Sequence, residues 1–134
     1  MTEEGKRSLV FDTSAMLKVL NREQGHEKIT ALFNSYNGAC IASVLSMHEI
    51  AWSVGRRDFH AVASALSFFE EVCTFIRPGE KDMLASAILR LKYKHLGLSM
   101  ADAMILQLGL GTGSEIVTCD RAWSKVAEAK VRVV

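Results

Sequence analysis

The sequence predicts an α/β fold in which a central parallel β-sheet of about four to five strands is flanked by α-helices on both faces. Short apolar runs alternate with longer stretches of helical spacing along the chain. The apolar runs are continuous, as in parallel strands that are buried on both sides. A length of 134 residues, 49% of them hydrophobic, suits one hydrophobic core. We therefore expect a single domain over residues 1–134, with the polar residues 1–7 disordered.

The predicted strands are short apolar runs that end at turns or at polar residues. The run "SLVF" ends directly at Asp12, and "SEIVTC" is followed directly by Asp120. The run "CTFI" is closed by the turn signal Pro78-Gly79. The expected strands cover residues 8–11, 39–42, 73–76, 114–119 and 131–134.

The predicted helices have apolar residues spaced three or four positions apart. Asn37-Gly38 ends the second of them, and the glycines at positions 109, 111 and 113 are expected to form a helix C-cap and turn. The helix over 80–97 carries basic residues in its last turns, where the helix dipole favours them. The expected helices cover residues 13–21, 23–36, 43–56, 58–72, 80–97 and 121–129, with one more inside 96–109.

Composition and charge exclude several broad classes of protein. The net charge is +1, so the chain is not a general polyanion binder, although a local basic groove is not excluded. Three widely spaced cysteines without a CxxC motif argue against a disulfide framework or a zinc cluster. No apolar run approaches the ~20 residues of a membrane span, and the first residues lack the apolar core of a secretory signal. We expect a cytoplasmic protein with no membrane partner.

Acidic side chains lie at matching places near the ends of the predicted strands. Asp12 and Asp120 each follow an apolar strand. Glu49 lies on the helix after the second strand, and Asp102 lies at the start of the helix before the fourth. Open parallel sheets bind ligands outside the carboxyl ends of their strands. The topology can therefore bring all four acids to the same edge of the sheet.

Taken singly, each of these acids is more simply explained as part of a helix start. Ser99 and Asp102 match the S-x-x-D capping box. Ser46 and Glu49 fit S-x-x-E, unless Ser43 is the true start of that helix. The two acids that follow strands can each be the N-cap of the next helix.

Taken together, the four carboxylates indicate a metal site. Several carboxylates that share a crevice repel one another and raise each other's pKa. A divalent cation removes that penalty, and hard oxygen ligands suit Mg²⁺ or Mn²⁺ better than zinc. The usual substrate of such a site is a phosphate ester, whose oxygens complete the coordination of the ion.

Four segments of the chain also match a known pattern in order and spacing. They are "VFDTSAML", "SVLSMHEIAW", "LGLSMADAMILQLG" and "IVTCDRAW", and the matching region runs from residue 8 to about residue 127. With these segments the chain resembles the PIN-domain ribonucleases, and especially the small VapC-type toxins of toxin–antitoxin pairs. One short Asp-Thr-Ser would be a weak signal, but four segments in register are specific. The resemblance implies a PIN-like fold.

The resemblance implies hydrolysis of RNA phosphodiester bonds with Mg²⁺ or Mn²⁺, leaving a 5′-phosphate and a 3′-hydroxyl. It implies that Ser14 and Thr118 support the site. For Arg121 we favour pairing with an acid over contact with the scissile phosphate. The implied partners are RNA, an antitoxin protein and a second copy of the chain in a homodimer. The catalytic and metal-binding residues that it implies are Asp12, Glu49, Asp102 and Asp120.

Two surface features have both a plain and a functional interpretation. Arg56 and Arg57 are expected in a solvated loop, and the functional alternative is contact with the RNA backbone. Phe33, Tyr36 and Trp52 are expected to pack in the core. The functional alternative for these three is a groove for an antitoxin helix, or a homodimer face.

Other functions remain open at this point. A PIN-like module could hold RNA or protein without cutting, but such degenerate members typically lose one or more acids, and here all four positions are acidic. A housekeeping RNA-processing nuclease, a metal-dependent phosphatase or a DNA nuclease would use the same site. The sequence does not separate RNA from DNA, because recognition of the 2′-hydroxyl leaves no motif here.

Overall fold

The computed structural model describes residues 7–134 and contains a five-stranded parallel sheet with the strand order β3-β2-β1-β4-β5. This confirms the predicted fold class. Most of the segment 1–7, which we expected to be disordered, lies outside the described residues, and Arg7 is exposed. The strands are β1 (Leu9–Phe11), β2 (Cys40–Ser43), β3 (Thr74–Ile76), β4 (Glu115–Thr118) and β5 (Lys130–Val133).

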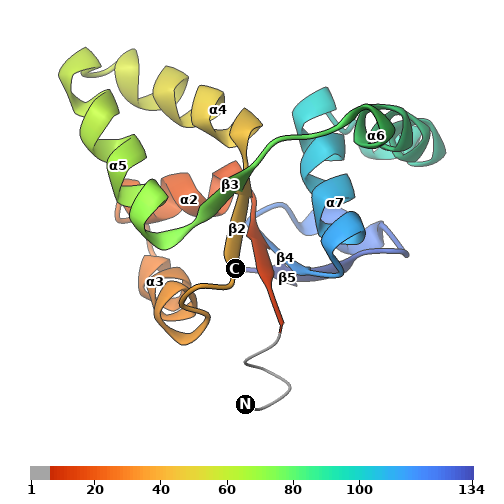
Figure 1. Cartoon of the computed structure of the whole chain (residues 1–134), viewed down its shortest axis with the longest axis horizontal. Helices are drawn as coiled ribbons and strands as arrows, with labels where there is room; N and C mark the ends of the chain where they lie inside the picture. Colours follow the sequence, from red (N-terminus) through yellow and green to blue (C-terminus); the bar gives the residue numbers. More distant parts are fainter. Residues whose placement is uncertain (1–6) are drawn as a thin grey trace.

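Helices cover both faces of this sheet. They are α2 (Thr13–Leu20), α3 (His26–Ser35), α4 (Val44–Gly55), α5 (Val62–Val72), α6 (Glu80–Lys92) and α7 (Met100–Thr112). Figure 1 shows the first four on one side of the sheet and α6 and α7 on the other. Within residues 7–134, no helix has the length and apolar character needed to cross a bilayer.

Alternating side chains of the central strand β1 divide the core into two halves. Phe11 belongs to the half under α2–α5, where its ring stacks on Phe33 with ring centroids 4.4 Å apart. Val10 belongs to the other half and packs with Ile105 of α7 and with Trp123. Phe33 is therefore a core residue, as expected.

Helix α7 lies against the sheet at a glycine. A Cβ atom on Gly109 would lie 2.4 Å from Cγ1 and Cδ1 of Ile116, a fully buried residue of β4. Gly109 and Gly111, expected in a C-cap and turn, instead continue the helix, and only Gly113, with φ 65°, forms the C-cap. The expectation was wrong for the first two: at Gly109, close packing on β4 outweighs the roughly 1 kcal/mol that a glycine costs inside a helix, and Gly111 lies within the same helix without such a contact.

Helix α6 ends earlier than the boundary predicted from the pattern over 80–97. Its last residue is Lys92, and the next residue, Tyr93, is buried. The Tyr93 hydroxyl accepts a hydrogen bond from the N–H of Ala127 at 3.0 Å and donates to the carboxylate of Glu128. These contacts tie the end of α6 to the segment that leads into β5, and the chain continues only as a short 3-10 turn.

Two other predicted helices consist partly or wholly of 3-10 turns. The helix expected over 58–72 begins with a 3-10 turn at Phe59–Ala61 before α5. The helix expected over 121–129 is a 3-10 turn over Arg121–Lys125. It ends there because the next residue, Val126, is buried and adopts an extended backbone that leads toward β5.

Replacing Gly109 with alanine should lower the free energy of unfolding by ~1–3 kcal/mol, because buried Ile116 has to move to admit the new Cβ. Gly111 is the matched control on the same helix, since the nearest atom to its Cβ position is Gln107 Nε2 at 3.9 Å. Gly111→Ala should raise the free energy of unfolding by ~0.5–1 kcal/mol. Urea unfolding measures both, and equal effects of the two substitutions would contradict the close packing of α7 on β4.

Candidate active site

The candidate site lies where the strand order of the sheet reverses. From β1 the chain builds β2 and β3 on one side, then crosses over to place β4 on the other side of β1. Open α/β sheets bind ligands at such a switch point, outside the carboxyl ends of the strands. Asp12 directly follows β1, and Asp120 follows β4 after Cys119. Phe11 and Val117 are paired in register, so the two strand ends lie side by side.

Asp12 occupies the N-cap position of α2 without capping the helix. Instead, its Oδ2 accepts hydrogen bonds from the hydroxyls of Ser14 at 2.7 Å and Thr118 at 2.8 Å. Ser14 Oγ in turn accepts from the N–H of Cys119 at 3.0 Å. Thr118 Oγ1 accepts from the N–H of Asp120 at 3.1 Å. The two hydroxyls therefore fix the carboxylate between β1 and β4, while its Oδ1 has no hydrogen-bond partner among residues 7–134.

Burial raises the pKa of Asp12 to about 6, well above the ordinary value for an aspartate. The side chain is removed from water, and loss of hydration disfavours the ionised form. Hydrogen bonds from Ser14 and Thr118 lower the pKa because they stabilise the carboxylate. The negative charges of Asp102 and Glu49 raise it further. These two acids are therefore close enough to Asp12 to act on it electrostatically.

Glu49 is held by a buried threonine that the sequence analysis did not single out. The Thr13 hydroxyl donates to Glu49 Oε1 at 2.6 Å and lies 2.9 Å from Ser46 Oγ. The N-cap of α4 is Ser43, whose Oγ accepts from the N–H of Leu45 at 3.1 Å. Ser46 and Glu49 therefore do not form a capping box, and Glu49 is turned toward the start of α2.

Asp102 and Asp120 do cap helices, as their positions in the sequence suggest. Asp102 Oδ2 accepts from the N–H of Ser99, and the N–H of Asp102 donates to Ser99 Oγ, both at 3.0 Å. This is the predicted capping box. Asp120 Oδ1 accepts from the N–H of Ala122 at 2.9 Å. Each acid keeps one carboxylate oxygen that makes no hydrogen bond within residues 7–134, so capping leaves room for a ligand.

The four predicted acids line one open hollow of about 380 Å³. In their present rotamers, no three His, Cys, Asp or Glu side chains in residues 7–134 converge closely enough to hold one ion. The donor set nevertheless fits Mg²⁺ or Mn²⁺, because every donor is a hard carboxylate oxygen. Glu49 and Asp102 are half-buried and Asp120 is exposed, and each has one carboxylate oxygen that makes no hydrogen bond in residues 7–134.

The three arginines that we singled out lie in different places. Arg56 is exposed at the end of α4 and lines the hollow. Arg57 does not line it; its NH1 lies 3.4 Å from Asn21 Oδ1, beside a groove between α2, α4 and α5. Arg121 is exposed and makes no ion pair with an acid in the described part of the chain, so the pairing that we favoured is not found.

Two tryptophans in the wall of the hollow had no predicted place at the site. Trp52 is 65% exposed, so the expectation that it packs in the core was wrong. Trp123 is buried, and its Nε1 is the one buried side-chain nitrogen or oxygen without a hydrogen-bond partner in residues 7–134. Tyr36 is half-buried against the core, as expected. The signals that could have found the missed residues are the place of Thr13 directly after Asp12, and those of Trp52 and Trp123 three residues after Glu49 and Asp120.

The model of the PIN domain family matches residues 9–129, from β1 to the segment before β5. The chain belongs to the PIN domain family. The matched region includes all four acids of the hollow. None of the curated proteins matches the sequence of this PIN domain.

Solved structures similar to this PIN domain share its fold at low sequence identity. VapBC from Salmonella typhimurium, solved with bound DNA, has a TM-score of 0.78 at 14% identity, covering 95% of this chain and 98% of that chain. VapBC2 from Rickettsia felis, bound to a promoter DNA fragment, has a TM-score of 0.76 at 15% identity, covering 93% and 97%. A toxin–antitoxin complex from Klebsiella pneumoniae has a TM-score of 0.75 at 19% identity, covering 94% and 97%.

Asp12→Asn should make the protein more stable than the wild type at about pH 7.5, by up to about 3 kcal/mol. The substitution removes a buried charge and keeps an oxygen that can accept from Ser14 and Thr118. Because the pKa of Asp12 is raised to about 6, the folded protein binds a proton that the unfolded chain does not bind until the pH nears 3.8. The wild type therefore gains stability as the pH falls from about 7 to about 4, and the advantage of the variant shrinks over that window.

Urea unfolding across this pH range, without divalent cations, measures the difference between the two proteins. Glu71→Gln, which alters an exposed acid of α5 far along the chain from the site, should keep the pH dependence of the wild type. A stability difference between Asp12→Asn and wild type that does not change with pH would show that the Asp12 carboxylate is not destabilised by burial.

Proposed function

We propose that this PIN domain is a metal-dependent endoribonuclease that hydrolyses RNA phosphodiester bonds as the toxin of a toxin–antitoxin pair. The observation that carries the proposal is the hollow at the carboxyl edge of the sheet, lined by Asp12, Glu49, Asp102 and Asp120. Burying a carboxylate without a full set of partners is costly, and perturbed carboxylates in a cleft are typical of functional sites. Membership of the PIN domain family supports nuclease chemistry.

Each of the four proposed metal ligands has one oxygen available for an ion. In Asp12, Ser14 and Thr118 hold one oxygen and leave the other available. Glu49, Asp102 and Asp120 each use one carboxylate oxygen in a hydrogen bond, and the second oxygen of each would complete the ligand set. When bound, Mg²⁺ or Mn²⁺ supplies Lewis acidity toward the phosphate and lowers the pKa of a bound water.

The chain's own groups orient the reactants around this set. The hydroxyl of Thr13 holds Glu49 and leaves Oε2 to bind the ion or to accept a proton from the attacking water. Arg56, exposed at the rim, would contact a backbone phosphate of the RNA. Trp52, exposed beside it on the same helix, offers a ring on which an unpaired base can stack. These two groups favour a single-stranded RNA substrate.

We also propose an antitoxin as partner. The VapBC structures from Salmonella typhimurium and Rickettsia felis and the Klebsiella pneumoniae complex are toxin–antitoxin assemblies on this fold. A groove of about 330 Å³ between α2, α4 and α5 has Leu20, Val54 and Phe68 in its lining, with Arg57 and Asp58 beside them. This chemistry fits an amphipathic helix that carries both charges on its polar side. A second copy of the chain is the other proposed partner.

Incubating the purified protein with single-stranded RNA and Mn²⁺ should give fragments with 5′-phosphate and 3′-hydroxyl ends, and EDTA should stop the reaction. Asp12→Asn and Asp102→Asn should each lower the cleavage rate at least about 100-fold, because each removes a charged ligand from the site. Glu71→Gln is the control and should cleave at the wild-type rate. DNA of the same sequence should be cleaved more slowly or not at all.

The same cleavage assay tests whether Arg56, at the rim of the hollow, contacts the RNA. Arg56→Glu should raise KM with little change in kcat, while Arg57→Glu, which does not line the hollow, should leave both unchanged. Cleavage that persists in EDTA, or in both aspartate variants, would overturn the proposed chemistry. Tight RNA binding by a wild type that never cleaves would instead identify a non-cutting binding module.

A further inference from the structure

The indole N–H of Trp123 is a buried hydrogen-bond donor that lacks an acceptor. Trp123 is 1% exposed, and its Nε1 is the one buried side-chain nitrogen or oxygen without a partner in residues 7–134. An unpaired buried donor costs stability, so native proteins contain few of them, and they are found where a site gains its partner later. The acceptor of this N–H is therefore expected to come with a bound ligand.

The side of the indole ring that borders the acidic hollow is the side that offers acceptors. Trp123 lines this hollow together with the four acids. Elsewhere the ring belongs to an apolar core cluster that includes Val10 and Ile105. The only hydroxyl among the buried members of this cluster is that of Tyr93, which already makes two hydrogen bonds. The carboxylates of the hollow are therefore the natural acceptors for the N–H.

Asp102 lies on the face of α7 that is turned to the core cluster of Trp123. Ile105 and Leu106, three and four residues after Asp102, both belong to that cluster. Residues at these spacings share one face of a helix. Gly109, seven residues after Asp102, lies on the same face and contacts β4. The stripe that begins with Asp102 therefore faces the sheet and the indole ring.

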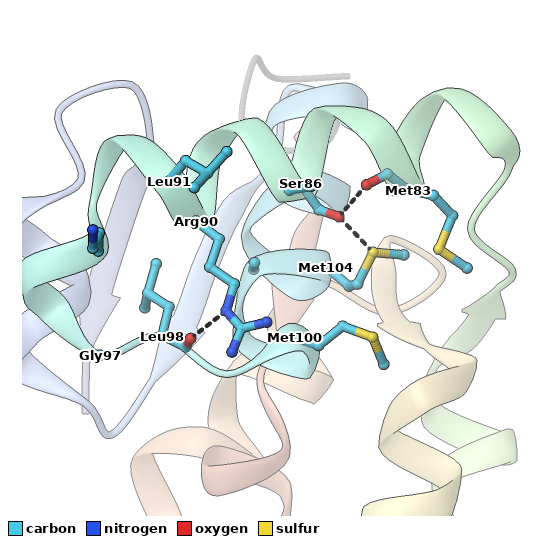
Figure 2. Close-up of a pocket in the computed structure, with 11 residues that line it drawn as sticks. Met83, Ser86, Arg90, Leu91, Gly97, Leu98, Met100 and Met104 are labelled. Carbon is cyan, nitrogen blue, oxygen red and sulfur yellow. Dashed lines mark hydrogen bonds between the residues drawn. The ribbon is translucent and has the colours of Figure 1, made fainter.

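The opposite face of α7 is turned to α6. Figure 2 shows Met100 and Met104 at an apolar groove of about 750 Å³ between the two helices, where the Ser86 hydroxyl donates to Met104 Sδ at 2.8 Å. Each of these methionines is two positions from Asp102, which at 3.6 residues per turn places them on nearly the opposite side of α7. Asp102 accordingly does not line this groove.

Asp102 also suits the indole better than the other free acid of the hollow. Its Oδ2 accepts from the N–H of Ser99, while its Oδ1 makes no hydrogen bond in residues 7–134. Asp102 is half-buried, whereas Asp120 is exposed. A hydrogen bond to a buried N–H gains most where water does not compete for it, and this favours Asp102.

We propose that Trp123 is a positioning residue of the metal site, whose indole N–H donates to the Asp102 carboxylate when an ion is bound in the hollow. Carboxylates that bind metal ions are themselves hydrogen-bonded, and these outer contacts orient them. A carboxylate has about four lone-pair sites, so hydrogen bonds from Ser99 and Trp123 leave room for an ion. The inference rests on the metal site of the proposed function.

Calorimetric titration of Mn²⁺ into Trp123→Phe tests this role, because the substitution removes the N–H and keeps an aromatic ring in the core. The affinity should be at least about 10-fold weaker than in the wild type. Phe69→Leu, which shortens a buried aromatic side chain in the other half of the core, is the matched control and should bind Mn²⁺ as the wild type does.

A second pair of backgrounds tests which acid the indole holds. In Asp102→Asn, adding Trp123→Phe should cause no further loss of Mn²⁺ affinity, because the N–H acts through Asp102. In Asp120→Asn, adding Trp123→Phe should still cost at least about 10-fold. A loss that persists in Asp102→Asn and disappears in Asp120→Asn would overturn the assignment to Asp102.

Nitrogen–proton NMR of the wild type follows the N–H directly, since the chain has two tryptophans and Trp123→Phe identifies the signal. Saturating Mg²⁺ should move the indole proton of Trp123 downfield as its hydrogen bond forms, more than that of exposed Trp52. A role in packing alone would not give this shift.

The results separate this inference from the proposed function on which it rests. If the wild type binds Mn²⁺ and Trp123→Phe binds it equally well, the inference is wrong and the metal site stands. The same holds if bound Mg²⁺ leaves the Trp123 indole signal unmoved. A wild type that binds neither ion would overturn the metal site, and the role of Trp123 with it.

Discussion

The Asp12 carboxylate directly follows the central strand β1 and is largely removed from water. The other groups of the site are arranged around this buried carboxylate. One of its oxygens accepts from the hydroxyls of Ser14 and Thr118, and each hydroxyl is itself fixed by a backbone N–H next to the end of β4. This small network joins two neighbouring strands at the switch point of the sheet. It holds a charge where burial raises its pKa to about 6. A cation in the hollow would offset the same penalty, so the feature that destabilises the protein alone would stabilise its metal complex.

The other three acids are held near this carboxylate by helix caps and by a helix of the fold. Asp102 and Asp120 each cap a helix with one oxygen and keep the other free. Glu49 sits one turn inside α4 and is held by Thr13, the first residue of α2. Helix α7 carries Asp102, and that helix lies close to β4 because Gly109 leaves room for Ile116. Residues that start helices therefore also line the site. This explains why each acid, taken alone, looks like part of a helix start in the sequence.

The sequence predicted a parallel sheet of about four to five strands and the approach of the four acids to one edge of it, because continuous apolar runs and the residues that follow them are local patterns. It failed where packing between distant segments decides the outcome. Helix α6 stops at Lys92 because Tyr93 is tied to Ala127 and Glu128, residues far along the chain. The pattern of glycines before β4 is typical of a turn, but Gly109 lies inside α7, where it is needed for the contact with Ile116 of β4.

At the site, the same limit applies to the supporting groups. The roles of Ser14 and Thr118 came from resemblance, and nothing local in the sequence assigned Thr13 to Glu49. Trp52 was expected in the core on its apolar character alone, and the structure leaves it exposed on α4. The exposure of Leu84, Ile88 and Leu91 on α6 could not be predicted either, because an apolar helix pattern gives no sign of which face the fold leaves uncovered.

A metal site centred on Asp12 can be tested by calorimetric titration of Mn²⁺ into the wild type and Asp12→Asn, at about pH 7.5 where Asp12 is ionised. The wild type should bind Mn²⁺ saturably, and the affinity of the variant should be at least about 10-fold weaker, because the buried carboxylate ligand is lost. Glu71→Gln should bind as the wild type does. Equal Mn²⁺ affinity in wild type and Asp12→Asn would contradict the claim that the buried carboxylate is the centre of a metal site.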